Sequence, residues 1–201
     1  MTPLLSLLIA YLLGATPFGY LLVKLKTGHD VRALGSGNIG ATNVLRTTSR
    51  ALGILTLLLD IGKGFLAVWI AGRLTAGSPL WTSAAALAVM AGHAFPVFLG
   101  FHGGKAVASL VGAFLYLAPG PLAVALALFV VVVAVTRFIS LGSIIAAAAL
   151  PLLTWLIARP PAPVVAAAAL GGAFIIWRHK ENIARLRAGK ESVLALGGRR
   201  T

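Results

Sequence analysis

Long apolar segments take up most of the chain and limit what it can fold into. The first, from Leu4 to Val23, has about twenty residues, enough for one helix to cross the ~30 Å hydrocarbon layer of a bilayer. The others are 51–71, 80–100, 106–118, 122–136, 141–158 and 164–177. Only 10% of the 201 residues are charged, whereas a soluble chain carries roughly a quarter. The sequence therefore predicts an all-α integral membrane protein of about seven transmembrane helices.

Turn-forming residues separate these segments. Glycine and proline gather at 77–79, 103–104, 119–121 and 160–163, and such clusters mark turns and loops. The segments 106–118 and 122–136 are short, and the pattern allows either two short spans or one re-entrant hairpin. We expect one transmembrane domain over 1–201, with polar segments at 24–50, 101–105 and 178–201.

The cations predict an orientation. With seven spans, every Lys and Arg falls on one face except Lys63, inside the second segment, and Arg73 and Arg159, on the opposite face. Positively charged loops stay on the cytoplasmic side of a membrane. We therefore expect the polar segments and the C-terminus in the cytoplasm and the N-terminus outside.

Composition also excludes several kinds of chemistry. The net charge is +13, but the chain lacks the polar surface of a nucleic-acid binder, so the expected anions are lipid headgroups or substrates. Cysteine is absent, which excludes disulfides and thiolate ligands. Asp and Glu total only 4, too few for a carboxylate cage, so we expect neither a metal nor a cofactor.

The first polar segment contains a glycine-rich run from Gly35 to Arg46. Its glycines permit tight turns and close approach of the backbone to a ligand, and successive N–H groups can form an anion-binding nest. The guanidinium of Arg46 can bind phosphate through two parallel hydrogen bonds. Neutral polar side chains accompany it: Ser36, Asn38, Thr42 and Asn43. A flexible connector is the alternative interpretation.

The second polar segment contains Gly103, Gly104 and Lys105. We expect them to open a helix, with free N–H groups and the helix dipole facing an anion and Lys105 supplying a point charge. A plain turn with a snorkelling lysine is the alternative. Upstream, His93 lies inside an apolar span, where a polar side chain needs a partner, so we interpret it as a hydrogen-bonded structural histidine.

The third polar segment extends the last apolar helix. His179 and Asn182 are three residues apart and therefore share a helix face, among cations that suit an anionic substrate. A basic amphipathic tail at the membrane surface is the alternative. Glu191 follows Gly189, where the helix is expected to stop, and we interpret it as a structural residue that ties the tail back to a basic loop residue.

Two opposite charges lie inside the second apolar segment. Asp60 and Lys63 are three residues apart, so they can pair on one helix face. Isolated charges are costly in a bilayer. We therefore expect the pair to point into the helix bundle and to serve the structure.

The usual groups for acyl transfer are missing. Neither Asp30 nor Asp60 completes a His-x-x-x-x-Asp base, and no Gly-x-Ser-x-Gly elbow is present. A transfer reaction here would depend on positioning and charge stabilisation, and positioning alone can lower a barrier by ~7–11 kcal/mol. A substrate that carries its own phosphate suits such a site.

Together, the three segments resemble the three motifs of the PlsY family, the bacterial acyl-phosphate:glycerol-3-phosphate acyltransferases. The matching residues are 35–43 for the first motif, 92–96 with 103–108 for the second, and 179–183 with Arg185, Leu186, Gly189 and Glu191 for the third. Two positions depart from the family pattern. His102 stands where Lys or Arg is usual, and Ser109 where Thr is common.

The resemblance implies transfer of a fatty acyl group from acyl phosphate to the 1-hydroxyl of glycerol 3-phosphate, giving lysophosphatidic acid and inorganic phosphate in the first step of phospholipid biosynthesis. It implies a monomer in the bacterial inner membrane with a cytoplasmic active site. The implied catalytic residues are Ser36, Arg46, Lys105, His179 and Asn182. The implied substrate-binding residues are Gly37, Asn38, Gly40, Thr42, Asn43, Gly103 and Gly104. The structural residues are Asp60, Lys63, His93 and Glu191.

A small transporter or channel for an organic anion is the competing function. Seven spans, a basic mouth and the intramembrane charges Asp60 and Lys63 suit it. Transporter sites usually lie near the midplane, however, whereas the polar segments here are expected on one face.

Overall fold

The computed structural model describes residues 1–194, and every regular element among them is helical, as the sequence predicts. The chain divides into two compact units, one covering 1–117 and the other beginning at Ala118. Arg199 and Arg200, which the sequence analysis counts among the cytoplasmic cations, lie outside the described residues.

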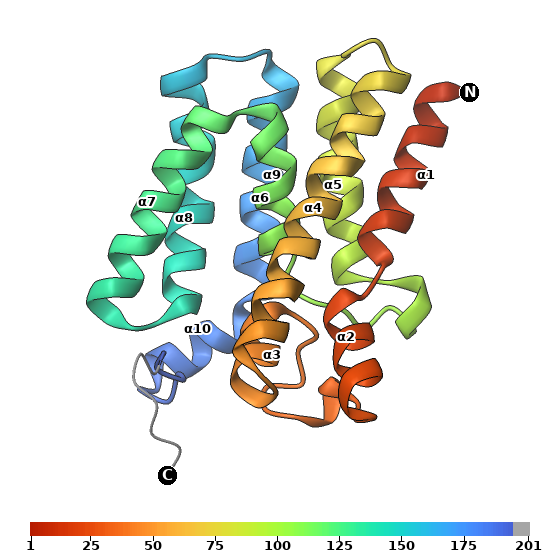
Figure 1. Ribbon diagram of the computed structural model, residues 1–201. Helices are drawn as coiled ribbons and strands as arrows, with labels where there is room; N and C mark the ends of the chain where they lie inside the picture. The colour runs from red at the N-terminus through yellow and green to blue at the C-terminus, as the bar shows by residue number, and fades with distance from the viewer. Residues whose placement is uncertain (195–201) are drawn as a thin grey trace. The chain divides into compact units, whose positions relative to one another are not determined.

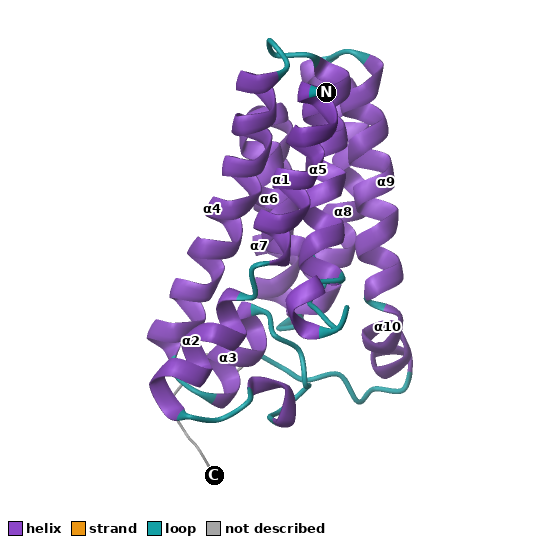
Figure 2. Ribbon diagram, turned by 90° about the vertical axis from the view of Figure 1, so that its right-hand side faces the viewer, coloured by secondary structure: helices purple, strands orange, loops and turns teal. Residues whose placement is uncertain are grey.

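The first unit is built from the helices α1 to α6 (Figure 1). Their bounds are α1 Thr2–Ala15, α2 Phe18–Thr27, α3 Ala41–Thr47, α4 Arg50–Leu74, α5 Pro79–Ala94 and α6 Val107–Leu117, with 3₁₀ turns η1 Val31–Ala33 and η2 Val97–Leu99. Figures 1 and 2 show α2 and α3 at the end of this unit opposite the N-terminus. The first polar segment therefore gathers at one end of the unit.

The second unit contains the remaining helices. They are α7 Pro119–Thr136, α8 Ile139–Leu153, the π-helical turn η3 Thr154–Ala158, α9 Ala162–Arg178 and α10 Lys180–Arg187. Helix α8 packs against both α7 and α9. The N–H of Leu194 donates to the carbonyl of Arg137 at 2.8 Å, so the tail after α10 is attached to the α7–α8 connection.

All of the apolar segments are helical, but they differ in length. The stretches with the length and composition of a membrane span are Thr2–Thr27, Arg50–Leu74, Pro79–Leu99, Pro119–Thr136 and Ile139–Ala158. If α9 and α10, which are bent by 57° relative to each other, count together as one span, the described part of the chain has up to 6 such spans. Helix α6 has only 11 residues, about half of what a ~30 Å layer requires.

The break expected at 119–121 differs in the structure, because α7 begins at Pro119 itself. Proline has a fixed φ and no N–H, and both properties suit the first turn of a helix. Helix α7 consequently has 18 residues and is long enough to cross a bilayer alone. The short length expected for this segment is therefore wrong.

Glycines allow helices of the first unit to pack closely. A Cβ atom at Gly64 of α4 would collide with the backbone of Ser109 in α6, and one at Gly112 of α6 would collide with the carbonyl of Ile61 in α4. Membrane helices commonly associate through small residues in this way. The same reciprocal arrangement joins α1 and α5, with Gly14 against Val89 and Gly92 against Tyr11.

Pro17 divides the first apolar segment into α1 and α2. The residue before a proline is pushed out of the helical conformation, and Thr16 is extended with ψ 113°. Its carbonyl accepts hydrogen bonds from the N–H of Phe18 at 3.2 Å and from Nζ of Lys63 at 2.8 Å. Lys63, a buried lysine of α4, therefore stabilises the backbone conformation at the break between α1 and α2.

Candidate active site

Asn43, in the first turn of α3, organises the glycine-rich loop. Its Oδ1 accepts from the N–H of Ser36 at 3.0 Å. Its Nδ2 donates to the carbonyls of Leu34 at 3.0 Å and Asn38 at 2.8 Å. The side chain is buried. The amide of Asn43 is therefore used to shape the loop from within.

The loop is anchored by apolar side chains and leaves polar ones accessible. Ile39 and Val44 are buried together with Val23 and Val31. Ser36 and Gly37 are exposed, and so is Arg46 in the last turn of α3. Buried apolar residues thus fix a loop whose serine and arginine can meet a ligand.

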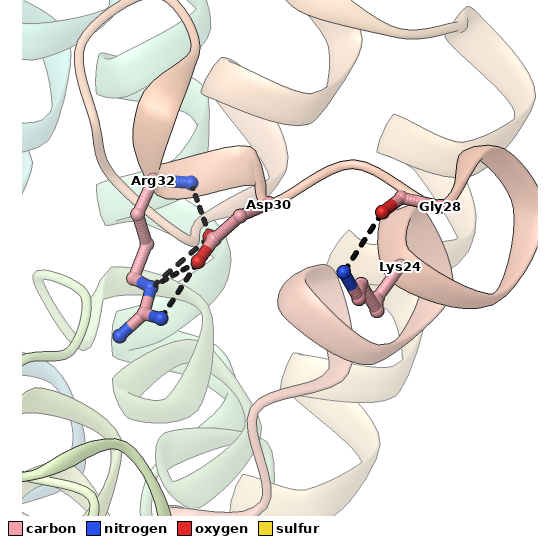
Figure 3. Close-up of polar contacts among 4 residues, drawn as sticks. All are labelled: Lys24, Gly28, Asp30 and Arg32. Carbon is pink, nitrogen blue, oxygen red and sulfur yellow. Dashed lines mark hydrogen bonds and ion pairs between the residues drawn. The ribbon is translucent and has the colours of Figure 1, made fainter.

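An ion pair fixes the chain just before this loop (Figure 3). The N–H of Arg32 donates to Oδ1 of Asp30 at 2.9 Å, and the guanidinium Nη2 donates to Oδ2 at 2.7 Å. These hydrogen bonds lower the pKa of Asp30 below its usual value. The sequence interpretation above does not include this pair, although the Asp-x-Arg spacing is a signal for it.

Nearby, Lys24 closes α2 by donating from Nζ to the carbonyl of Gly28 at 2.8 Å (Figure 3). The Arg32 guanidinium also lies over the ring of Tyr20 in α2, 5.2 Å from its centroid. The connection from α2 to the glycine-rich loop is therefore held by contacts of Lys24 at its start and of Arg32 at its end.

The second polar segment does not present its glycine N–H groups to an anion. The N–H of Gly103 donates to the carbonyl of Ala94 at 3.1 Å, and that of Gly104 donates to the carbonyl of His93 at 3.0 Å. The expectation of free N–H groups is therefore wrong, because the loop uses them to bind the end of α5. Helix α6 begins only at Val107, so Lys105 is a half-buried loop residue rather than the first residue of a helix.

His102 belongs to the turn that precedes these glycines. It is exposed, and its Nδ1 lies 2.6 Å from the carbonyl oxygen of Gly100. The side chain that replaces the usual Lys or Arg therefore interacts locally with the backbone of its own turn.

The intramembrane charges form the expected pair. Nζ of Lys63 lies 2.8 Å from Oδ1 of Asp60, and both side chains are only 3% exposed. Nδ1 of His93 on α5 lies 3.7 Å from the same carboxylate oxygen. The structure thus adds His93 to the pair, a contact that sequence spacing could not predict because the residues come from different helices.

In the second unit, His179 lies at the junction of α9 and α10. Its Nδ1 is 2.8 Å from the carbonyl oxygen of Ile175, and the side chain is buried. Because a carbonyl only accepts, Nδ1 must carry the hydrogen, and in the neutral ring Nε2 is then the acceptor nitrogen. Asn182, three residues later, is also buried.

Glu191, in the tail after α10, accepts hydrogen bonds from side chains of α10 and α8. Its Oε1 accepts from Nδ2 of Asn182 at 2.7 Å and from Oγ of Ser140 at 2.9 Å, and its Oε2 accepts from Nε of Arg185 at 2.8 Å. Burial raises the pKa of Glu191, but these donors outweigh burial and hold the pKa below its usual value. The sequence predicted a link to a basic loop residue, whereas the cation that Glu191 binds, Arg185, lies in α10. The sequence did not predict the contact with Ser140, which is 51 positions away.

Among residues 1–194, no group of three or more His, Cys, Asp or Glu side chains is arranged to hold a metal ion. The polar segments also carry the cations Arg46 and Lys105, whose side chains suit the oxygens of anionic substrates.

Long apolar helices joined by ordered polar loops that carry cations are typical of an integral membrane protein that binds anions. A family model described as glycerol-3-phosphate acyltransferase matches residues 4–189. The chain therefore belongs to the glycerol-3-phosphate acyltransferase family, and the resemblance seen in the three motifs is confirmed.

Relatives from bacteria match this chain over nearly its full length. The glycerol-3-phosphate acyltransferase of Geobacter sulfurreducens is 49% identical over 184 residues, covering 92% of this chain and 93% of the relative. That of Trichlorobacter lovleyi is 52% identical over 186 residues, covering 91% and 93%.

Two solved structures share the fold. Both are crystal structures of PlsY, described as an integral membrane glycerol 3-phosphate acyltransferase. The glycerol 3-phosphate form is similar with a TM-score of 0.91 and 38% identity, covering 97% of this chain and 96% of that one. The lysophosphatidic acid form is similar with a TM-score of 0.87 and 36% identity, covering 96% and 95%.

Proposed function

We propose that this acyltransferase moves a fatty acyl group from acyl phosphate to the 1-hydroxyl of glycerol 3-phosphate. The products are lysophosphatidic acid and inorganic phosphate. The observation that carries the proposal is the likeness, with a TM-score of 0.91, to a PlsY structure in its glycerol 3-phosphate form. Membership in an acyltransferase family argues against the organic-anion transporter.

The proposed catalytic residues divide between the two units. Ser36, Arg46 and Lys105 belong to the first, and His179 and Asn182 to the second. Arg46 and Lys105 neutralise substrate phosphates, since both cations suit phosphate oxygens. Ser36 and Asn182 orient the attacking hydroxyl or the acyl carbonyl oxygen.

The glycine-rich segments support these residues. We propose that Gly37, Asn38, Gly40 and Thr42 form the phosphate-binding surface of the first loop. Asn43 acts on substrate indirectly, because its amide holds the loop backbone. Gly103 and Gly104 likewise act through the loop that carries Lys105, since their N–H groups bind α5.

The reaction needs a proton acceptor, and we propose that the acyl phosphate provides it. The hydroxyl oxygen of glycerol 3-phosphate attacks the acyl carbon, the bond from that carbon to the phosphate oxygen breaks, and the phosphate leaves with the hydroxyl proton. His179 is the competing base through Nε2. A pH–rate profile that shows a group of histidine-like pKa, and loses it in His179→Gln with binding intact, would assign the proton to His179 instead.

We further propose a monomer in the bacterial inner membrane with seven crossings, of which α6 is the short one. The N-terminus lies outside, and the polar segments, the C-terminus and the active site lie in the cytoplasm. The excess of Lys and Arg in these segments supports this orientation.

The deciding experiment supplies purified protein in detergent with glycerol 3-phosphate and acyl phosphate, acyl-CoA or acyl carrier protein in turn. We expect release of inorganic phosphate and formation of lysophosphatidic acid with acyl phosphate alone. No turnover with acyl phosphate would refute the proposal. Arg46→Ala and Lys105→Ala should each abolish turnover without unfolding the protein, and near-normal activity in both would remove the site assignment.

A further inference from the structure

Three polar side chains lie buried together beside the loop that carries Lys105. Asp60 and Lys63 come from α4 and His93 from α5, and each is at most 4% exposed. The proposed reaction assigns no chemistry to any of them. Burying charges costs free energy that an ion pair often fails to recover, so the cluster calls for a role besides stability.

One side of the cluster is fixed to the helix break in the first apolar segment. Nζ of Lys63 bridges the carbonyl of Thr16 and the carboxylate of Asp60, at 2.8 Å from each. The same ammonium lies over the ring of Phe18, 5.6 Å from its centroid. Lys63 therefore holds Asp60 in a defined place relative to the start of α2.

The opposite side of the cluster meets His93. At 3.7 Å, the separation between Nδ1 of His93 and Oδ1 of Asp60 is too long for a hydrogen bond but short enough for electrostatic attraction. A carboxylate at that position favours the ring orientation and tautomer that place a hydrogen on Nδ1. Asp60 therefore orients the imidazole of His93.

His93 in turn is in close contact with the second polar loop. A Cβ atom at Gly104 would collide with Nε2 of His93, so the ring edge lies directly against the loop backbone. The carbonyl of His93 accepts the N–H of Gly104 at 3.0 Å. The ring and the backbone carbonyl of His93 therefore both fix the position of Gly104. Because Lys105 is the next residue, its backbone position is constrained as well.

We propose that Asp60, Lys63 and His93 form a positioning cluster that places Lys105 for its substrate phosphate. This inference rests on the proposed function, in which Lys105 binds a phosphate. The three residues are positioning residues, because they act through the loop at 101–106 and do not touch the reacting atoms.

The kinetic test uses two variants that leave no buried charge unpaired. Asp60→Asn/Lys63→Met removes both members of the ion pair, and His93→Leu removes the ring nitrogens. The reference is Lys105→Arg, which keeps the charge but moves it. We expect both cluster variants to raise the KM of the same substrate that Lys105→Arg affects, by about 10- to 100-fold, with a smaller change in kcat.

Thr56→Val is the matched control. Thr56 is fully buried in α4, one turn before Asp60, and its hydroxyl donates only within its own helix, to the carbonyl of Leu52 at 2.7 Å. This variant loses a buried polar group in the same helix and should keep wild-type KM values. Equal KM changes in Thr56→Val and the cluster variants would overturn the proposal.

Hydrogen exchange gives a second readout that does not depend on turnover. In detergent, we expect faster exchange at 101–106 in both cluster variants, with unchanged exchange in α3. Folded variants with wild-type KM and wild-type exchange would show that the cluster is merely structural. If the wild-type protein itself fails to use acyl phosphate, the proposed function fails, while the exchange comparison still decides whether the cluster orders the loop.

Discussion

At the scale of single residues, two buried side chains, Asn43 and Glu191, each form several hydrogen bonds that fix the conformation of a polar segment. Asn43 forms hydrogen bonds with backbone groups of the glycine-rich loop, and Glu191 accepts hydrogen bonds from side chains of α8 and α10. Both residues stand out in the sequence because they belong to the motifs. The role of Asn43 inside the loop was not predictable, because only the fold decides which backbone groups its amide contacts.

Asn43→Asp should destabilise the loop. Aspartate keeps an oxygen for the N–H of Ser36 but replaces the Nδ2 donor with an oxygen that faces the carbonyls of Leu34 and Asn38. Leaving buried polar groups unsatisfied costs ~1–3 kcal/mol. Tryptophan fluorescence during thermal unfolding in detergent measures the effect.

Asn38→Asp is the matched control for this change. The side chain of Asn38 accepts from the N–H of Gly40 through Oδ1, and aspartate can still accept there. The control should therefore unfold at a temperature much closer to wild type. Equal losses in the two variants would contradict the role assigned to Asn43.

Glu191→Gln should destabilise the second unit in a pH-dependent way. The folded pKa of Glu191 lies below its ordinary value, so its contribution is fully present above that ordinary value, about 4.3, and is lost as the pH falls through the folded pKa. The difference in unfolding temperature between wild type and Glu191→Gln should therefore be largest near neutral pH and should shrink under acid. If the difference in unfolding temperature did not change with pH, the stabilising role of the ionised Glu191 carboxylate would be ruled out.

Glu181→Gln provides the comparison for Glu191. Glu181 lies in the first turn of α10 and is exposed. Exposed ion pairs contribute about 0–1 kcal/mol. Its replacement should leave the unfolding temperature nearly unchanged across the same pH range.

At the scale of elements, hydropathy predicted which segments are helical but not where each begins. Pro119 starts α7 where the sequence suggested a break, and α6 is shorter than a span. Both outcomes depend on features that the apolar pattern does not contain. A proline can either interrupt a helix or begin one, and the loop before α6 is fixed by hydrogen bonds to α5, a distant segment of the chain.

Neighbouring glycines on α4 allow a sharp test of helix packing. A methyl group at Gly64 would collide with the backbone of Ser109, whereas one at Gly62 would meet nothing within 4 Å. Gly64→Ala should therefore lower the unfolding temperature by forcing α4 and α6 apart. Gly62→Ala should keep or raise it, because alanine is favoured over glycine in a helix by ~1 kcal/mol. A lower unfolding temperature for Gly62→Ala than for Gly64→Ala would contradict this packing of α4 against α6.

At the scale of the whole molecule, the charge distribution predicts an orientation, whereas the apolar pattern alone does not set the number of crossings. The described helices provide five candidate spans, or up to 6 with the bent pair. The family could be recognised from the sequence because three motifs occur in order. The contacts of His93 with Asp60 and of Ser140 with Glu191 could not, since they join residues far apart in the chain.

The absence of cysteine makes the orientation directly testable. Single cysteines introduced at Ser36 and at Gly77 should react with a membrane-impermeant maleimide from opposite sides of sealed vesicles. We expect labelling at Ser36 from the cytoplasmic side and at Gly77 from the outside. Labelling of both from one side would contradict the proposed topology.

The spacing of Asp60 and Lys63 has a consequence for how the protein is made. An ion pair within one helix is complete as soon as that helix has formed, before any neighbour arrives. Single charges at the centre of a helix resist transfer into lipid by ~2.5–3.5 kcal/mol each on insertion scales. Helix α4 can therefore leave the translocation channel with its charges already compensated. The contacts of the pair with Thr16 and His93 can form only once the segments that carry these two residues pack against α4.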